Sequence, residues 1–224
     1  MWFSNYKLIE KKKLTQDVYE MVFSDWNETT NKPGQFITFM LPKTKFGRAY
    51  SICETKWDKY IFIIKRVENW RWWSIEITDL EIAWELKAVW PSWHFILKEN
   101  NKAKMFLATW VGLAPLYNQL KAIADLWLHY KTKLIFWLRE KSDLFYIEKF
   151  KKLKKQIDFD YEIYFSKEEV EWYKKWHITE YLNKENINWF EEFYICGNPN
   201  MVDEVENKLT EAWVNQENIF REKY

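Results

Sequence analysis

The sequence predicts two domains, an antiparallel Greek-key β-barrel over residues 1–99 and a doubly wound, Rossmann-like α/β domain over residues 100–224. Three observations lead to this prediction. The chain has 224 residues, enough for two domains of about 100 residues each. Strand-like runs separated by turns fill the first part, whereas short apolar runs alternate with helical stretches in the second. A polar break at 100–102 separates the two patterns.

The strands expected in the first part are segments rich in β-branched and aromatic residues. They cover 17–24, 35–41 and 60–67, and Pro33-Gly34 marks a turn before the second of them. Antiparallel strands joined by turns are typical of a barrel or a sandwich.

The second part combines compact apolar runs with helical stretches. The runs are 105–109, 133–137, 161–165 and 193–196, and the helical stretches are 113–127, 143–156 and 200–212. Their alternation predicts a parallel sheet of about five strands with helices on both faces. Such sheets bind ligands at the carboxyl ends of their strands. The basic segment 149–155 is expected to be a solvated helix face.

Composition excludes several classes of protein. Lys and Arg number 34 against 33 Asp and Glu, so the net charge is +1, without the basic excess of a nucleic-acid binder. Hydrophobic residues make up 48% of the chain, enough for a core. No apolar run is long enough for a membrane span, and residues 1–13 contain no signal-peptide core. We therefore expect a cytoplasmic protein without a membrane span.

Cysteines and histidines predict no metal site. Cys53 and Cys196 are too few for a disulfide framework or an iron–sulfur cluster. Cys53 is expected to be a small buried residue rather than a nucleophile. His94, His129 and His177 are scattered and lack the spacing of metal ligands.

The counts of tryptophan and glycine are abnormal. The chain has 16 Trp and 4 Gly, whereas an average chain of this length has roughly 16 Gly. Many tryptophans stand where glycine is usual: in the expected turn 90–93, in the loop 69–74, in polar turns at Trp26 and Trp57, and at Trp110. One hypothesis is that most are UGA codons that the source organism reads as glycine. The alternative is a truly tryptophan-rich protein.

Four motifs carry the expected chemistry. Arg48-Ala49-Tyr50-Ser51 offers a cation, an aromatic ring and a hydroxyl at one strand end, although a strand with a paired arginine and a cross-strand tyrosine would look the same. Trp72-Trp73-Ser74 would become Gly-Gly-Ser under the recoding hypothesis, presenting backbone N–H groups to a pyrophosphate. The segment 109–115 (TWVGLAP) follows an apolar run, as a phosphate loop does. The segment 196–201 (CGNPNM) ends the last apolar run.

These four motifs, in this order, resemble the ferredoxin–NADP reductase family of flavoprotein reductases over about residues 5–224. The resemblance implies an FAD-binding barrel and an NAD(P)H-binding α/β domain. It implies that Arg48 pairs with the FAD pyrophosphate, that Tyr50 stacks on the isoalloxazine and that Ser51 hydrogen-bonds near flavin N5. The other cofactor-binding residues it implies are Ala49, Lys65, Val67, Trp72, Trp73, Ser74, Thr109, Trp110, Gly112, Ala114, Pro115, Arg139, Ser166, Lys167, Cys196, Gly197, Asn198, Met201 and Tyr224.

The chain end and Cys196 complete the implied site. Several relatives finish with an aromatic residue that covers the flavin, and some carry a glutamate two residues before it, as Tyr224 and Glu222 do here. A frayed terminus is the alternative. The implied catalytic residues are Ser51, Cys196, near the point of hydride transfer, and Glu222.

Two features depart from the family pattern. Trp72, Trp73 and Trp110 would put indoles where the backbone must approach phosphate, a position that favours glycine. The extra cysteines of members that carry an iron–sulfur centre are absent. Lys167 follows Ser166, with Lys174 and Lys175 nearby, at the position where relatives choose between cofactors. A lysine cannot bind the 2′-phosphate of NADPH through two parallel hydrogen bonds as an arginine can, so NADPH is only slightly favoured over NADH.

The resemblance implies an FAD-dependent NAD(P)H oxidoreductase that passes electrons to a ferredoxin-like or flavodoxin-like acceptor. Alternatives are a reductase component or electron-transfer subunit of a larger oxygenase or dehydrogenase complex, a free-flavin reductase, and a non-catalytic relative with a dead nucleotide site. The expected partner is a small redox protein or a partner subunit.

Overall fold

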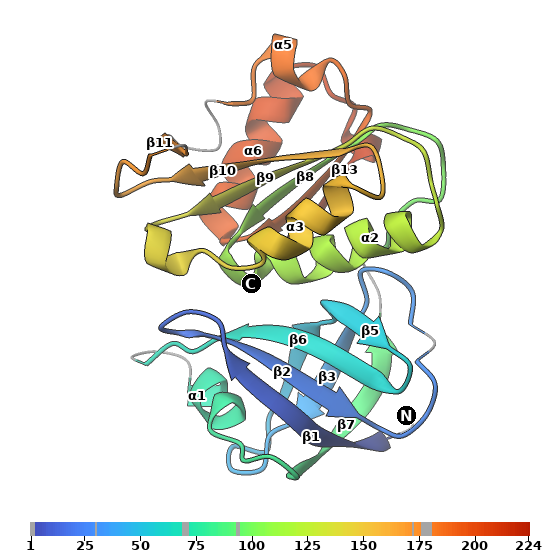
Figure 1. Cartoon of the computed structure of the whole chain (residues 1–224), viewed down its shortest axis with the longest axis vertical. Coiled ribbons are helices and arrows are strands. Elements are labelled where there is room, and N and C mark those ends of the chain that lie inside the picture. Colours follow the sequence, from blue (N-terminus) through green and yellow to red (C-terminus); the bar gives the residue numbers. More distant parts are fainter. Residues whose placement is uncertain (1–2, 30, 69–71, 93–94, 172, 176–180) are drawn as a thin grey trace.

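The structure is a computed structural model and describes residues 3–29, 31–68, 72–92, 95–171, 173–175 and 181–224 (Figure 1). Its first part is an antiparallel seven-stranded sheet in the order β4-β3-β7-β1-β2-β6-β5. The elements are β1 (Phe3–Lys13), β2 (Val18–Ser24), β3 (Phe36–Met40), β4 (Gly47–Ser51), β5 (Glu54–Lys56), β6 (Lys59–Lys65), α1 (Trp72–Thr78) and β7 (Glu85–Ser92). The predicted antiparallel, barrel-like domain is confirmed.

The second part is a parallel sheet in the order β11-β10-β9-β8-β12-β13. Its elements are β8 (Lys104–Thr109), α2 (Leu113–Asp125), β9 (Thr132–Leu138), α3 (Ile147–Lys154), β10 (Phe159–Phe165), β11 (Lys174–Lys175), α5 (Lys184–Ile187), β12 (Glu192–Gly197), α6 (Pro199–Glu211) and β13 (Ile219–Lys223). The predicted doubly wound sheet is confirmed, and the two-residue β11 extends the expected five strands. The two sheets lie on either side of residue 100, while the boundary at 99/100 stays a prediction.

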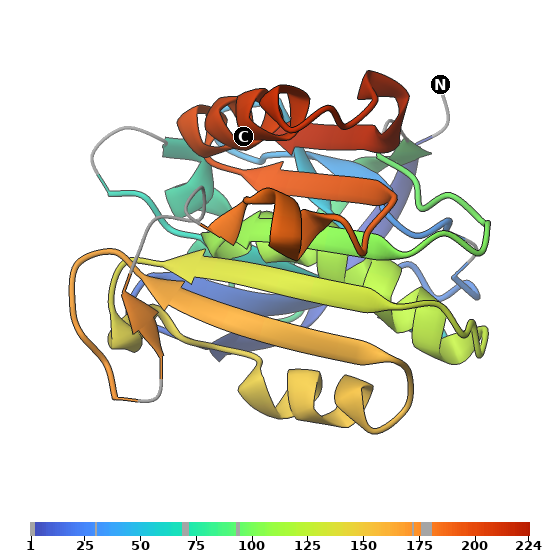
Figure 2. The same cartoon turned by 90° about the horizontal axis from the view of Figure 1, so that it is seen from above.

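Helices α2 and α3 lie between the parallel sheet and the barrel, whereas α6 covers the opposite face of that sheet (Figures 1 and 2). One hydrophobic cluster joins the two domains, since it unites residues of α2 and α3 with Val18, Cys53 and Ile63 of the barrel. A second cluster lies under α6, and a third fills the barrel. The interface is therefore part of a continuous core.

Polar contacts also cross this interface. Gly34 N donates to Asn118 Oδ1 at 3.1 Å, and Gln119 Nε2 donates to the Phe95 carbonyl at 2.7 Å. Gly34 has a φ of +97°, and a Cβ there would meet the Phe95 carbonyl oxygen at 1.9 Å. Only glycine fits this turn, because both its conformation and its packing exclude a side chain.

The basic segment 149–155 is not wholly a solvated face, which corrects the expectation. Lys149 Nζ lies 2.9 Å from Glu54 Oε2 and 3.3 Å from Glu20 Oε2, both on the barrel. Tyr146 Oη, one turn earlier, donates to Glu20. The buried positions of α3 face the core, and Lys149 anchors the helix to the barrel.

Other local expectations need correction. Trp90 was expected in a turn, but its backbone lies within β7. The expected helices 113–127, 143–156 and 200–212 end earlier or begin later than predicted, at the bounds given above. Trp70, Trp93, His94 and His177 lie outside the described residues. Within the described ranges, no helix is long and apolar enough to cross a membrane.

Candidate functional site

The topology of the parallel sheet predicts where a ligand binds. Strand β8 lies between β9 and β12: the chain runs outward from β8 through β9 and β10 to β11, and then returns to β12 on the other side of β8. A crevice forms where strand order reverses in this way, at the carboxyl ends of the two central strands. Here those ends carry Thr109 and Asn198, and Asn198 N donates to Thr109 Oγ1 at 2.9 Å.

Two glycines permit this close approach of the strand ends. Gly197 has a φ of +148°, and a Cβ there would lie 2.0 Å from Thr109 Oγ1. A Cβ on Gly112 would lie 2.2 Å from the Cys196 carbonyl oxygen. Both glycines hold the strand ends together rather than facing a ligand.

A pocket of about 1210 Å³ opens at this crevice, and we call it the interdomain pocket. Its volume exceeds the usual range of sites for drug-sized ligands, so it can hold a larger one. Both domains line it. The predicted site residues in its wall are Arg48, Ala49, Tyr50, Ser51, Lys65, Val67, Trp73, Ser74, Thr109, Trp110, Ala114, Arg139, Asn198, Glu222 and Tyr224.

Arg48 is the most distinctive group of the barrel wall. Its guanidinium donates to the Gly47 carbonyl at 3.1 Å and stacks over the Trp73 ring, 4.2 Å from the centroid. Its Nε is buried and has no hydrogen-bond partner among the described residues. A buried, unsatisfied donor on a cation is costly, so this atom indicates an anionic ligand.

Ser51 and Glu222, which both line the pocket, link the two domains. Ser51 Oγ, at the end of β4, donates to Glu222 Oε1 of β13 at 3.0 Å. Tyr224 N donates to the Gly197 carbonyl at 3.3 Å, which fixes the chain end against β12. The structure therefore brings Ser51, Glu222 and Tyr224 together, and this terminus is tied down rather than frayed.

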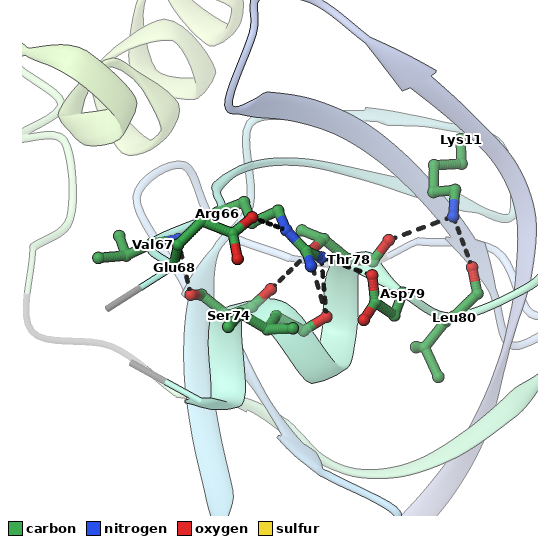
Figure 3. A network of polar contacts seen from close by, with 9 residues as sticks. Lys11, Arg66, Val67, Glu68, Ser74, Thr78, Asp79 and Leu80 are labelled. Atoms are coloured by element: carbon green, nitrogen blue, oxygen red, sulfur yellow. Dashed lines mark hydrogen bonds and ion pairs between the residues drawn. The ribbon is translucent and has the colours of Figure 1, made fainter. Parts of the chain in front are cut away.

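A polar network connects the residues after β6 with α1 (Figure 3). Val67 N donates to Ser74 Oγ at 3.0 Å. The Arg66 guanidinium bonds Glu68 at 2.6 Å and Thr78 Oγ1 at 3.0 Å, and also pairs with Asp79. Arg66 thus uses its charge to tie the end of β6 to α1, whereas Arg48 has no ion pair among the described residues.

Trp110 lies between cations from the two domains. Lys65 Nζ lies 4.2 Å from the centroid of its ring, and Arg139 Cζ lies 4.7 Å from it. Its backbone has a φ of 47°. Three cations of the pocket therefore make cation–π contacts with indoles. Arg48 contacts Trp73, and Lys65 and Arg139 contact Trp110.

Ser166 and Lys167 lie just outside the pocket wall. Their backbone N–H groups donate to Leu138 and Arg139 carbonyls, at 3.1 and 3.0 Å. Lys167 Nζ lies 3.4 Å from Glu140 Oε1, and Glu140 lines the pocket. This pairing places a carboxylate beside the lysine expected to meet a phosphate.

Several predicted residues do not line the interdomain pocket. Cys196 is fully buried, and burial raises the pKa of its thiol well above the ordinary value. Met201 packs in the core under α6. The others are Trp72, which is exposed, Gly112, Pro115, Ser166, Lys167 and Gly197. Their roles as site residues stay predictions.

Sequence reasoning missed other wall residues. They are Gln16, Asp17, Phe36, Ile63, Ile64, Arg66, Glu68, Glu140, Ser142, Asp143 and Lys223, whereas Val111 and Pro199 also line the pocket but lie within the predicted motifs 109–115 and 196–201. Glu140, Ser142 and Asp143 follow the carboxyl end of β9, so the rule that located Thr109 also predicts them. Among the described residues, no group of three or more His, Cys, Asp or Glu side chains forms a metal site.

Comparisons with known proteins agree with this geometry. Residues 106–207 match the family described as oxidoreductase NAD-binding domain. The toluate 1,2-dioxygenase electron transfer component of Pseudomonas putida is 24% identical over 201 residues, covering 88% of this chain and 60% of the relative. The chain thus spans less than two thirds of that relative's length.

Solved structures share the whole two-domain fold. The cytochrome P450 reductase GcoB of Amycolatopsis superposes with a TM-score of 0.89 at 18% identity, covering 99% of this chain and 70% of that one. A ferredoxin–NADP reductase of Neisseria gonorrhoeae, with bound FAD and NADP, gives 0.84 at 17% identity, covering 99% and 98%. The predicted resemblance to the ferredoxin–NADP reductase family is confirmed at the level of the fold.

Proposed function

We propose that this chain, an oxidoreductase NAD-binding domain joined to a barrel in the fold of ferredoxin–NADP reductases, is an FAD-dependent NAD(P)H oxidoreductase. The observation that carries the proposal is the interdomain pocket, in which Arg48, Tyr50 and Ser51 of the barrel face the carboxyl ends of β8 and β12. A bound flavin would accept a hydride from NAD(P)H and release electrons to an acceptor.

The barrel wall fits FAD. The buried, unpartnered Nε of Arg48 suits a pyrophosphate oxygen, because a guanidinium pairs with phosphate through charge-assisted hydrogen bonds. Tyr50 offers a ring to a flat ring system, and Ser51 Oγ offers a hydroxyl already oriented by Glu222. Ser74 accepts a hydrogen bond from Val67 N, which ties the start of α1 to the end of β6 on this side of the pocket.

The α/β wall fits a nicotinamide nucleotide. Thr109 and Asn198 mark the crevice where doubly wound sheets bind dinucleotides. Arg139 lies at the carboxyl end of β9, and the structure describes no ion pair of its side chain. Lys167 favours the 2′-phosphate of NADPH, whereas Glu140 beside it opposes that phosphate, so NADPH keeps only a slight preference.

Ser51 and Glu222 are proposed as the pair that orients the reacting groups. The Ser51 hydroxyl donates its hydrogen bond to Glu222. The hydroxyl oxygen could therefore accept a hydrogen bond from a donor group of a bound flavin. The hydride step needs no general base from the chain. The residues contribute position, exclusion of water and charge.

The test is to purify the chain, add FAD and record the visible spectrum, then measure oxidation of NADPH and NADH with ferricyanide as the acceptor. Flavin binding with turnover supports an independent reductase. The matched variant Ser51→Ala should keep FAD and slow flavin reduction by about tenfold or more, since it removes a charge-assisted hydrogen bond of about 1.5–3 kcal/mol. Absence of flavin binding under all conditions would refute the proposal.

A second candidate is the reductase component or electron-transfer subunit of a larger oxygenase or dehydrogenase complex. Its support is the match to relatives named as electron transfer components, of which the chain spans only part. Turnover that needs an added partner protein would favour it over a ferredoxin or flavodoxin reductase. Turnover with free FMN as the acceptor would instead favour a free-flavin reductase. The cytoplasm is the proposed setting.

A further inference from the structure

Two helices end in the same motif, each with a tryptophan at its centre. Beyond the end of α2, Trp127 N donates to the Ala124 carbonyl at 3.2 Å and Leu128 N to the Ile123 carbonyl at 3.0 Å. Trp127 has a φ of 52°. This pair of hydrogen bonds is a Schellman motif, whose left-handed residue is usually glycine.

Helix α6 repeats the arrangement. Trp213 N donates to the Thr210 carbonyl at 3.0 Å, and Val214 N donates to the Leu209 carbonyl at 3.0 Å. Trp213 has a φ of 68°. Its side chain is 86% exposed, so burial of the indole does not offset the energetic cost of the left-handed backbone conformation.

The hairpin between β5 and β6 shows the same substitution. Lys56 pairs with Lys59, leaving Trp57 and Asp58 as a two-residue loop. Trp57 has a φ of 55°, and Asp58 is not among the residues of positive φ. Positive φ at the first central residue alone is the pattern of a type II′ turn, which takes glycine at that place.

Tryptophan dominates the left-handed positions of this chain. Within the described residues, eight non-glycine residues have positive φ, and five of them are tryptophan: Trp26, Trp57, Trp110, Trp127 and Trp213. A bulky side chain is an outlier in this region. The four other than Trp110 are 68%, 76%, 71% and 86% exposed, so no core explains them.

We propose that positions 26, 57, 110, 127 and 213 are glycine in the protein that the source cell makes, through reading of UGA as glycine. We further propose that the absence of a side chain at 110 opens the nucleotide end of the interdomain pocket. This second part rests on the proposed function; the first does not. Removing the indole at 110 would uncover Arg139 and one side of Lys65, which now flank its ring, although Lys65 would keep its ion pair with Asp17.

The identity is tested on the gene and on protein isolated from its source. UGA codons at the five positions are expected. Trypsin should release peptides 122–131 and 209–221, each of which holds one of the five positions and no other tryptophan. Mass spectrometry should find both peptides lighter by the difference between tryptophan and glycine. UGG codons, or tryptophan in either peptide, would overturn the proposal.

Stability gives a second test that is independent of cofactors. Trp127→Gly and Trp213→Gly, made in the chain as written, should each raise the Tm by about 2–4 °C, because glycine removes the left-handed strain. Trp189→Gly is the matched control, since Trp189 is also exposed but its φ is not positive. The control should not raise the Tm, and an equal rise in all three would contradict the backbone argument.

Nucleotide binding tests the second part. With FAD bound, Trp110→Gly should tighten NADPH binding by about tenfold or more, measured as the Kd from a spectral titration without turnover. FAD affinity should stay unchanged. Unchanged NADPH affinity would overturn the proposal that position 110 opens the nucleotide end of the pocket. The proposal of glycine at the five positions would then depend on the gene and peptide results alone. Loss of FAD binding in both forms would instead count against the proposed function.

Discussion

Arg48→Ala gives the sharpest test of the interdomain pocket. Among the described residues, the guanidinium has one hydrogen bond, to the Gly47 carbonyl, and cation–π contacts with Trp73 and Phe46. Its Nε is buried without a partner. The fold therefore positions the Arg48 side chain without pairing its charge with a described carboxylate, whereas Arg66 forms ion pairs with Glu68 and Asp79.

The size of the effect follows from these contacts. Loss of a charge-assisted hydrogen bond to phosphate costs about 1.5–3 kcal/mol, which is about 10- to 100-fold in the Kd for FAD. The free energy of unfolding without FAD should fall by about 2 kcal/mol or less, because the protein itself loses one hydrogen bond to the Gly47 carbonyl and the cation–π contacts with Phe46 and Trp73. Arg48→Lys keeps the charge without the fork and should weaken FAD binding by less.

The assay is a titration of the cofactor-free protein with FAD, followed by flavin fluorescence, with urea unfolding run in parallel. Arg221→Ala is a suitable control, since Arg221 pairs with Glu206 and does not line the pocket. An unchanged Kd for FAD in Arg48→Ala would remove Arg48 from the site. A large fall in stability would show that the arginine holds the barrel rather than a ligand.

Three further predictions concern buried groups. Lys104 and Glu192 are buried 3.0 Å apart; Lys104→Met should lower the free energy of unfolding in urea by about 3–5 kcal/mol, and unchanged stability would contradict this. Burial opposes ionisation of Glu192, but its hydrogen bonds outweigh that effect and lower its pKa. Its contribution should thus be present above about pH 4.3, the pKa of an unperturbed glutamate, and be lost progressively as the pH falls from there through its lowered pKa. Urea midpoints measured across this range should lose that part of their pH dependence in Lys104→Met. Burial raises the pKa of Cys53 to about 12, and Cys196 is also buried, so a thiol reagent at pH 8 should label both only after denaturation; rapid labelling of the folded protein would refute this.

The sequence predicted the elements whose signals are local. The apolar strands and the order of the helices follow from period and composition. The prediction of a turn at 90–93 is wrong at Trp90, because Pro91, a residue type typical of turns, lies inside β7. In the structure the register between β3 and β7 shifts between Phe36 and Thr38, and a bulge of this kind tolerates proline inside a sheet.

The site was predictable where a motif sits at a strand end, as with Arg48 and Thr109. Contacts between residues far apart in sequence were not, since no periodicity encodes them. Ser51 and Glu222 are 171 residues apart, and only the docking of the two domains makes them neighbours. The pairing of Lys149 with Glu54 was missed for the same reason, because a lysine-rich helix looks solvated when its partner domain is unknown.

The hydrophobic cluster shared by α2, α3 and the barrel determines how the protein can move and fold. A hinge between the domains would have to separate Val18, Cys53 and Ile63 from the helices that cover them. The two walls of the pocket are therefore preorganised, and a ligand meets them at a fixed separation. A barrel fragment expressed without α2 and α3 would expose this apolar surface and aggregate, so the two domains are expected to unfold in one cooperative transition.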